Sequence, residues 1–203
     1  MDIFLNLFYN TSMKRFIILI VLGIFGCSIA NADDITGEQA KLLYADNNIN
    51  ESFNLLLTIP EDDRTAENWF LLGNILHDRG RNDDAIFMYT QAILKDDKFF
   101  KAYYNLGNSY LEADKPNMAI IEYKNAIKLN KDYAYAYYNM GCAYIKLGDY
   151  KKARNAILDA IFYKNTEPDF HYNLAYVYKK LNKPKDAQVY LEFYNKLIEN
   201  KLQ

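Results

Sequence analysis

The stretch that decides the fold runs from residue 100 to residue 148 and reads FKAYYNLGNSYLEADKPNMAIIEYKNAIKLNKDYAYAYYNMGCAYIKLG. Within it Tyr103 and Gly107 return as Tyr137 and Gly141, 34 positions later. Working outward, the same interval joins five classes of residue: Trp69, Tyr103, Tyr137 and His171; Leu72, Leu106, Met140 and Leu174; Gly73, Gly107, Gly141 and Ala175; Ala85, Ala119, Ala153 and Ala187; Tyr89, Tyr123, Ile157 and Leu191. A fixed period of this length indicates one supersecondary unit that is copied, each copy covering the apolar face of the next.

Each copy is expected to be a helical hairpin. Apolar residues fall at helical spacing, and the break between two helices coincides with residue types that tolerate the left-handed conformation, namely Gly80, Asp114, Gly148 and Asn182. Pro116 and Pro184 come two residues later, where a helix start needs no amide donor. The small residues of the third class are expected to face the alanines of the fourth, so that the two helices of a hairpin approach closely.

These residues resemble the tetratricopeptide repeat family, whose pattern is Trp-x-x-Leu-Gly-x-x-Tyr followed by Ala-x-x-x-Phe. The chain has it as Trp69-Phe-Leu-Leu-Gly73, Tyr103-Tyr-Asn-Leu-Gly107, Tyr137-Tyr-Asn-Met-Gly141 and, more loosely, His171-Tyr-Asn-Leu-Ala175. The family's terminal Pro is replaced by Asp97, Lys131 and Asn165. The resemblance implies an all-α fold, an α-α superhelix or solenoid, with repeats at 66–99, 100–133, 134–167 and 168–203.

Both ends of the array have their own predictions. Upstream, residues 33–65 form a degenerate helical hairpin that caps the stack, because five residues match the repeat slots one position out of register: Ala40, Leu43, Ser52, Leu56 and Ile59. Downstream, residues 184–201 form a longer final helix that seals the last hairpin. An exposed part of this helix could pair with a second copy of the protein, giving a homodimer.

A peptide-binding groove follows from the resemblance, which implies that the first helix of each hairpin lines the inner face. The residues expected to line it are Asn74, Tyr104, Asn105, Asn108, Tyr138, Asn139, Tyr172 and Asn173. Amide side chains offer donors and acceptors to a peptide backbone, and tyrosines offer apolar area with a polar tip. Alternatively, the asparagines tie neighbouring helices together and the tyrosines pack between repeats.

The sequence disfavours other classes of function. The net charge of −2, or −3 without the first 32 residues, provides no basic footprint for nucleic acid or an anionic membrane. No cofactor, metal or catalytic site is predicted, since His77 and His171 lie almost three repeats apart, and Cys142 is expected to be a small packed thiol.

Capture of a chaperone's terminal carboxylate is also disfavoured. Family members that do this use cations, but the matching slots here hold Phe70, Asn74, Asn105, Tyr135 and Asn139.

The N-terminus is typical of an export signal. Lys14 and Arg15 precede an apolar run that is too short to span a bilayer, and Ala30-Asn31-Ala32 suits cleavage after Ala32. Translation from Met13 would give a more usual leader. An alternative is lipidation at Cys27, which follows Ile24-Phe25-Gly26, and a further alternative is an uncleaved anchor.

The sequence therefore predicts a non-enzymatic scaffold or adaptor that binds protein or extended peptide in the periplasm or as a secreted protein. One alternative is a lipid-anchored outer-membrane factor that assembles a secretion or pilus complex. Another, of a different class, is an enzyme or small-ligand sensor that uses the tyrosine-lined hollow.

Overall fold

The computed structural model describes residues 32–201. Contact clustering divides the chain into two compact units, residues 1–71 and 72–203, with the division inside helix α5 (Ala66–Asp78). Length alone gave no sign of this division. The predictions on Met13, Cys27 and cleavage after Ala32 concern a segment that lies outside the described residues, except for Ala32 itself, where helix α3 begins.

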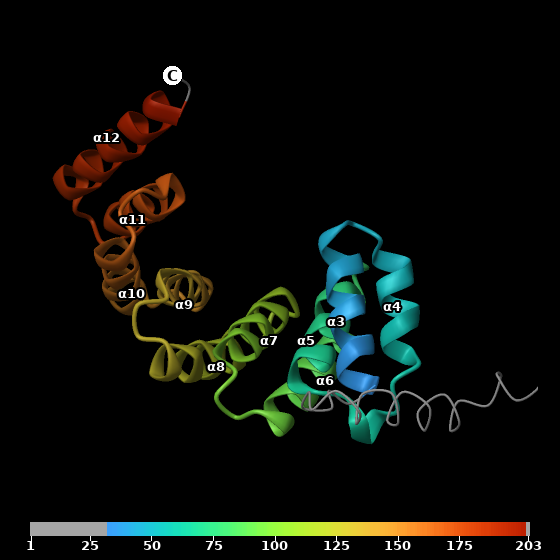
Figure 1. Ribbon diagram of the computed structural model, residues 1–203. Coiled ribbons are helices and arrows are strands. Elements are labelled where there is room, and N and C mark those ends of the chain that lie inside the picture. Colours follow the sequence, from blue (N-terminus) through green and yellow to red (C-terminus); the bar gives the residue numbers. More distant parts are fainter. Residues whose placement is uncertain (1–31, 202–203) are drawn as a thin grey trace, which may run out of the picture. The chain divides into compact units, whose positions relative to one another are not determined.

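The first unit contains the helix pair α3 (Ala32–Ala45) and α4 (Ile49–Leu57), then the short 3-10 helix η1 (Glu61–Asp63), as Figure 1 shows in blue and cyan. The pair turns at Asn47, whose φ of 63° is left-handed. The Ser52 hydroxyl donates to the Ala40 carbonyl at 2.7 Å, and Ala40, Leu56 and Ile59 are buried. Asn47 lies one position out of register with Gly80, like the residues that defined the predicted hairpin.

The second unit contains helices that pack side by side in chain order: α6 (Asn82–Lys95), α7 (Phe100–Glu112), α8 (Pro116–Leu129), α9 (Ala134–Lys146), α10 (Tyr150–Tyr163), α11 (Pro168–Lys180) and α12 (Pro184–Lys201) (Figure 1). The described residues contain no strand. The predicted all-α solenoid is confirmed. None of the described helices is long and apolar enough to cross a membrane.

The turns inside the hairpins have the backbone conformation that the sequence predicted. Gly80 and Gly148 have φ of 73°, and Asp114 and Asn182 have φ of 57°. In each case the next residue's amide returns to a carbonyl near the helix end, as Lys115 N–H does to Tyr110 C=O at 2.8 Å. These left-handed residues end the first helix of each hairpin.

The close approach within a hairpin differs from our expectation. A Cβ added at Gly107 would lie 2.6 Å from a ring carbon of Tyr123, and one at Gly73 would lie 2.5 Å from the ring of Tyr89. The glycines thus face the residue four positions after the expected alanine. The alanines are buried for a different reason, since Ala85, Ala119 and Ala153 have no exposed surface and only a methyl group fits there.

His171 occupies the tryptophan and tyrosine class for a local reason. The Tyr137 hydroxyl donates to the Lys131 carbonyl at 3.0 Å, six residues earlier. The His171 Nε2 lies 2.8 Å from the Asn165 carbonyl, also six residues earlier. A histidine protonated at Nε2 therefore makes the same connection as a tyrosine at this position.

Candidate peptide-binding ladder

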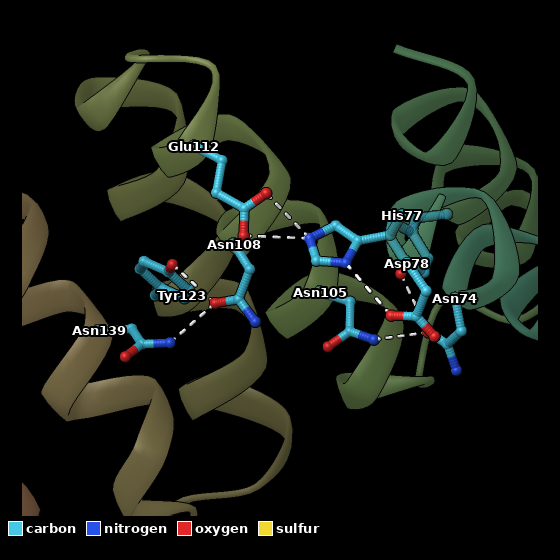
Figure 2. A network of polar contacts seen from close by, with 9 residues as sticks. Asn74, His77, Asp78, Asn105, Asn108, Glu112, Tyr123 and Asn139 are labelled. Carbon is cyan, nitrogen blue, oxygen red and sulfur yellow. Dashed lines mark hydrogen bonds and ion pairs between the residues drawn. The ribbon is translucent and has the colours of Figure 1, made fainter. Parts of the chain in front are cut away.

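The predicted asparagines meet one another across successive repeats. The first helices α7, α9 and α11 each carry one at the same position, and their Nδ2 atoms all donate to the preceding repeat. Asn105 Nδ2 donates to Asn74 Oδ1 at 2.8 Å, and Asn139 Nδ2 donates to Asn108 Oδ1 at 2.8 Å (Figure 2). We call Asn105, Asn139 and Asn173 the asparagine ladder, and each inter-repeat connection a rung.

Tyrosine hydroxyls supply a second acceptor on two rungs. Asn139 Nδ2 also donates to the Tyr104 hydroxyl at 3.0 Å, and Asn173 Nδ2 donates to the Tyr138 hydroxyl at 2.6 Å. Burial raises the pKa of both tyrosines, so both hydroxyls are neutral at physiological pH. The expectation that asparagines tie helices together thus describes their Nδ2 atoms.

The Oδ1 atoms of the ladder are different. Among the described residues, Asn105, Asn139 and Asn173 form no hydrogen bond through Oδ1, and in Figure 2 no dashed line reaches this atom in Asn105 or Asn139. All three side chains are half-buried, so these oxygens lie at the surface of the stack. The chain presents one free amide acceptor per repeat.

Asn74 and Asn108 hold the rungs and also satisfy the core. The hydroxyl of Tyr89 donates to Asn74 Oδ1 at 3.0 Å, and that of Tyr123 donates to Asn108 Oδ1 at 2.9 Å. Both tyrosines are buried, so their hydroxyls need a partner inside the protein. The spacing of 15 residues between each Asn and its Tyr is visible in the sequence.

The third hairpin lacks both members of this pair. Cys142 stands in the slot of Asn108, and Ile157 stands in the slot of Tyr123. Ile157 has no hydroxyl, so position 142 needs no amide. Asn173 Nδ2 lies 3.7 Å from the Cys142 sulfur, and burial raises the pKa of this thiol to about 11. The geometry is that of a packed, protonated thiol.

Aromatic rings surround the beginnings of the first helices. Tyr133 makes edge contacts with Phe100 at 5.1 Å and Tyr104 at 5.0 Å between ring centroids, and Tyr138 stacks on Phe170 at 4.4 Å. The packing expected for the tyrosines is therefore present. Tyr172 differs, because it is 52% exposed and contacts only Tyr194, at 5.3 Å, among the ring pairs of the described chain.

Lys164 is a residue that sequence reasoning missed. Its Nζ lies 2.6 Å from the Tyr135 hydroxyl and 2.7 Å from Glu167 Oε1. Hydrogen bonds from Glu167 and then Tyr135 raise the pKa of Lys164. A cation therefore reaches the slot where Tyr135 replaces a cation, but Glu167 neutralises it. No group of three or more metal-ligating side chains is found among the described residues.

Comparison with known proteins follows from this geometry. Models of the TPR repeat match residues 73–114 and 117–148, and models of the tetratricopeptide repeat match residues 134–163 and 168–200. The chain is a tetratricopeptide repeat protein. Proteins of this family generally mediate contacts between proteins, and their repeats are typically not enzymes.

Solved structures share the fold. A crystal structure of MamA is 23% identical with a TM-score of 0.74, covering 86% of this chain and 99% of that chain. A MamA RS-1 ArsTM double mutant is 16% identical with a TM-score of 0.78, covering 86% and 98%. MamA 41-end from Desulfovibrio magneticus RS-1 is 17% identical with a TM-score of 0.77, covering 85% and 98%. No curated protein sequence matches the chain.

Proposed function

We propose that this tetratricopeptide repeat protein is an adaptor that binds an extended segment of a partner protein along the asparagine ladder. Backbone N–H groups of the segment donate to Oδ1 of Asn105, Asn139 and Asn173. The observation that carries this proposal is that every ladder amide uses its donor inside the stack and leaves its acceptor unused.

The chemistry of the ladder selects its ligand. A row of neutral acceptors favours donors without charge, and an extended peptide supplies backbone N–H groups at regular intervals. Tyr172, half-exposed beside the ladder, adds apolar area for a side chain of the ligand. Affinity of this kind does not depend on the ligand's sequence at the ladder itself.

A peptide array tests the proposal. Ten-residue overlapping peptides from envelope proteins are screened, and the tightest binder is remade with single backbone N–H groups methylated. We expect two or three of these methylations to weaken binding about 2- to 10-fold each, which corresponds to about 0.5–1.5 kcal/mol per hydrogen bond. Equal affinity of all the methylated peptides, or no binding peptide at all, would refute the proposal.

Substitutions separate an acceptor role from a purely structural one. In Asn139→Asp the side chain keeps its oxygens and loses the donor, whereas Asn139→Ala loses both. If the oxygen binds the ligand, Asn139→Asp retains peptide affinity and Asn139→Ala does not, although both destabilise the stack. Equal loss in the two variants would mean that the residue is only a tie. Asn155→Ala, on helix α10 and contacting only Arg154 through its side chain within the described chain, is the matched control.

The proposed location is the cell envelope, after export. It rests on the basic residues, apolar run and Ala30-Asn31-Ala32 of the N-terminus. The intact mass of the protein isolated from cells tests it, since a chain beginning at Asp33 and a chain lipidated on Cys27 have different masses. The second outcome would favour the lipid-anchored assembly factor, and an unprocessed chain would contradict both.

A further inference from the structure

The two compact units carry opposite charge. Residues 33–71 have nine Asp and Glu against two Lys and Arg, a net charge of −7. Residues 72–203 have 16 Asp and Glu against 20 Lys and Arg, a net charge of +4. The total of −3 hides this division, so the absence of a basic face cannot be inferred from the total charge.

Helix α3, in the acidic unit, has an exposed stripe of matching character. Asp34, Glu38 and Asp46 lie on this side, and between them Ile35 and Leu42 are 45% and 64% exposed. At 1.5 Å per residue the stripe is about 18 Å long. Lys41 borders it, but its charge is neutralised by Glu67 at 3.1 Å and Glu38 at 3.6 Å.

Helix α12, in the basic unit, has an exposed stripe of the opposite charge. Lys185 and Lys196 lie at its ends, and Val189 and Phe193, 48% and 50% exposed, lie between them. The stripe is about 17 Å long. Neither lysine forms an ion pair with another described residue. Glu192 borders the stripe and accepts a hydrogen bond from Gln188 at 3.1 Å.

The face of α12 that would receive another repeat is closed. The second helix of an earlier hairpin covers the next hairpin with apolar residues, such as Ile120 on α8 and Leu158 and Ile161 on α10. In α12 the equivalent positions hold Gln188, Glu192 and Asn195. A polar outer face is what ends a repeat array. A second copy would therefore contact the lysine stripe rather than extend the stack.

We propose that copies of this chain associate head to tail, with the α12 stripe of one copy on the α3 stripe of the next. Lys185 and Lys196 face Asp34, Glu38 and Asp46, and Val189 and Phe193 cover Ile35 and Leu42. A symmetric contact between two α12 helices is disfavoured because an antiparallel pair brings lysine against lysine. This surface is independent of the asparagine ladder and of the proposed function.

Sedimentation velocity of the protein as isolated from cells tests the proposal. We expect the mean mass to rise with protein concentration at low salt, and the rise to disappear near 1 M salt, where the Debye length falls to about 3 Å. A head-to-tail contact continues into rings or filaments, so species larger than a dimer are expected. A monomer at every concentration in low salt would overturn the proposal.

Charge reversals identify the surfaces. The variants K185E/K196E and E38K/D46K should each be monomeric, and an equal mixture of the two should associate, because each then meets a surface of opposite charge. The control K101E/K128E makes the same change of net charge on other helices and should associate like the wild type. Association that survives either reversal, fails to return in the mixture, or is lost in the control would overturn the assignment.

An anionic membrane is the competing occupant of the lysine stripe. If the wild type stays monomeric and binds vesicles of mixed phosphatidylglycerol and phosphatidylcholine, and K185E/K196E loses this binding, the stripe serves a membrane and the proposal is wrong. Circular dichroism spectra of all variants should match the wild type, since every substituted residue is exposed.

Discussion

The buried hydroxyl of Tyr123 depends on the side chain of Asn108. Its O–H donates to Asn108 Oδ1 at 2.9 Å, and the tyrosine has no exposed surface. In Asn108→Ala the hydroxyl loses this partner, which costs about 1–3 kcal/mol. Asn139 Nδ2 keeps the Tyr104 hydroxyl at 3.0 Å, so the rung itself is only weakened. Tyr123→Phe alone removes one hydrogen bond and should cost about 0.5–1.5 kcal/mol.

The double variant Asn108→Ala/Tyr123→Phe should cost less than the sum of the single variants. The hydroxyl that Asn108→Ala leaves unpaired no longer exists, so we expect a coupling of about 1 kcal/mol. Urea unfolding followed by circular dichroism measures it, because 2 kcal/mol shifts the midpoint by about 1 M. The Asn74→Ala/Tyr89→Phe pair, with its bond of 3.0 Å, should show the same coupling. Additive effects in both pairs would refute the reasoning.

Further predictions concern single positions. Gly107→Ala should destabilise the fold by about 1–3 kcal/mol, measured by urea unfolding, because the new Cβ would lie 2.6 Å from the ring of Tyr123. Cys142 should react with a maleimide at pH 7 much more slowly in the folded protein than in urea, because burial raises its pKa to about 11. Asp149→Ala should lower the urea midpoint at pH 7, since Asp149 caps helix α10 by accepting from Lys152 N–H at 3.1 Å. The Lys152 side chain and amide hold the pKa of Asp149 below its usual value, so the stabilisation is present above the unfolded pKa and should vanish as pH falls through the folded pKa.

The period of 34 residues predicted the helices and their turns because each is a local event. A left-handed residue ends a helix wherever it stands, so Gly80, Asp114, Gly148 and Asn182 could be assigned from type and spacing. The same reasoning could have found Asn47 as the turn of the first hairpin, since its register shift matches that of Ala40 and Ser52.

Contacts that depend on side-chain direction could not be predicted in this way. The sequence placed the small residue at 107 opposite the second helix, but the choice between Ala119 and Tyr123 depends on how far the two helices are rotated about their axes. Likewise, an asparagine offers both donors and an acceptor, and only the three-dimensional arrangement shows that the donor is used inside the stack. Lys164 lies 29 residues from Tyr135, and no local pattern links the two.

The composition of the rungs argues that the direction of the ladder amides is what the repeats maintain. The first rung has the amide acceptor Asn74, the second has both Asn108 and the Tyr104 hydroxyl, and the third has the Tyr138 hydroxyl where Cys142 replaces the amide.

Each rung thus has at least one strong acceptor for the ladder Nδ2, and an amide whose nitrogen is held in this way leaves its oxygen free. The single variants Asn108→Ala and Tyr104→Phe should therefore keep Asn139 oriented, and only the double variant should release it. Peptide affinity should follow the same pattern, with little loss in either single variant and a loss in the double variant comparable to Asn139→Ala. A loss already complete in one single variant would show that the two acceptors are not redundant.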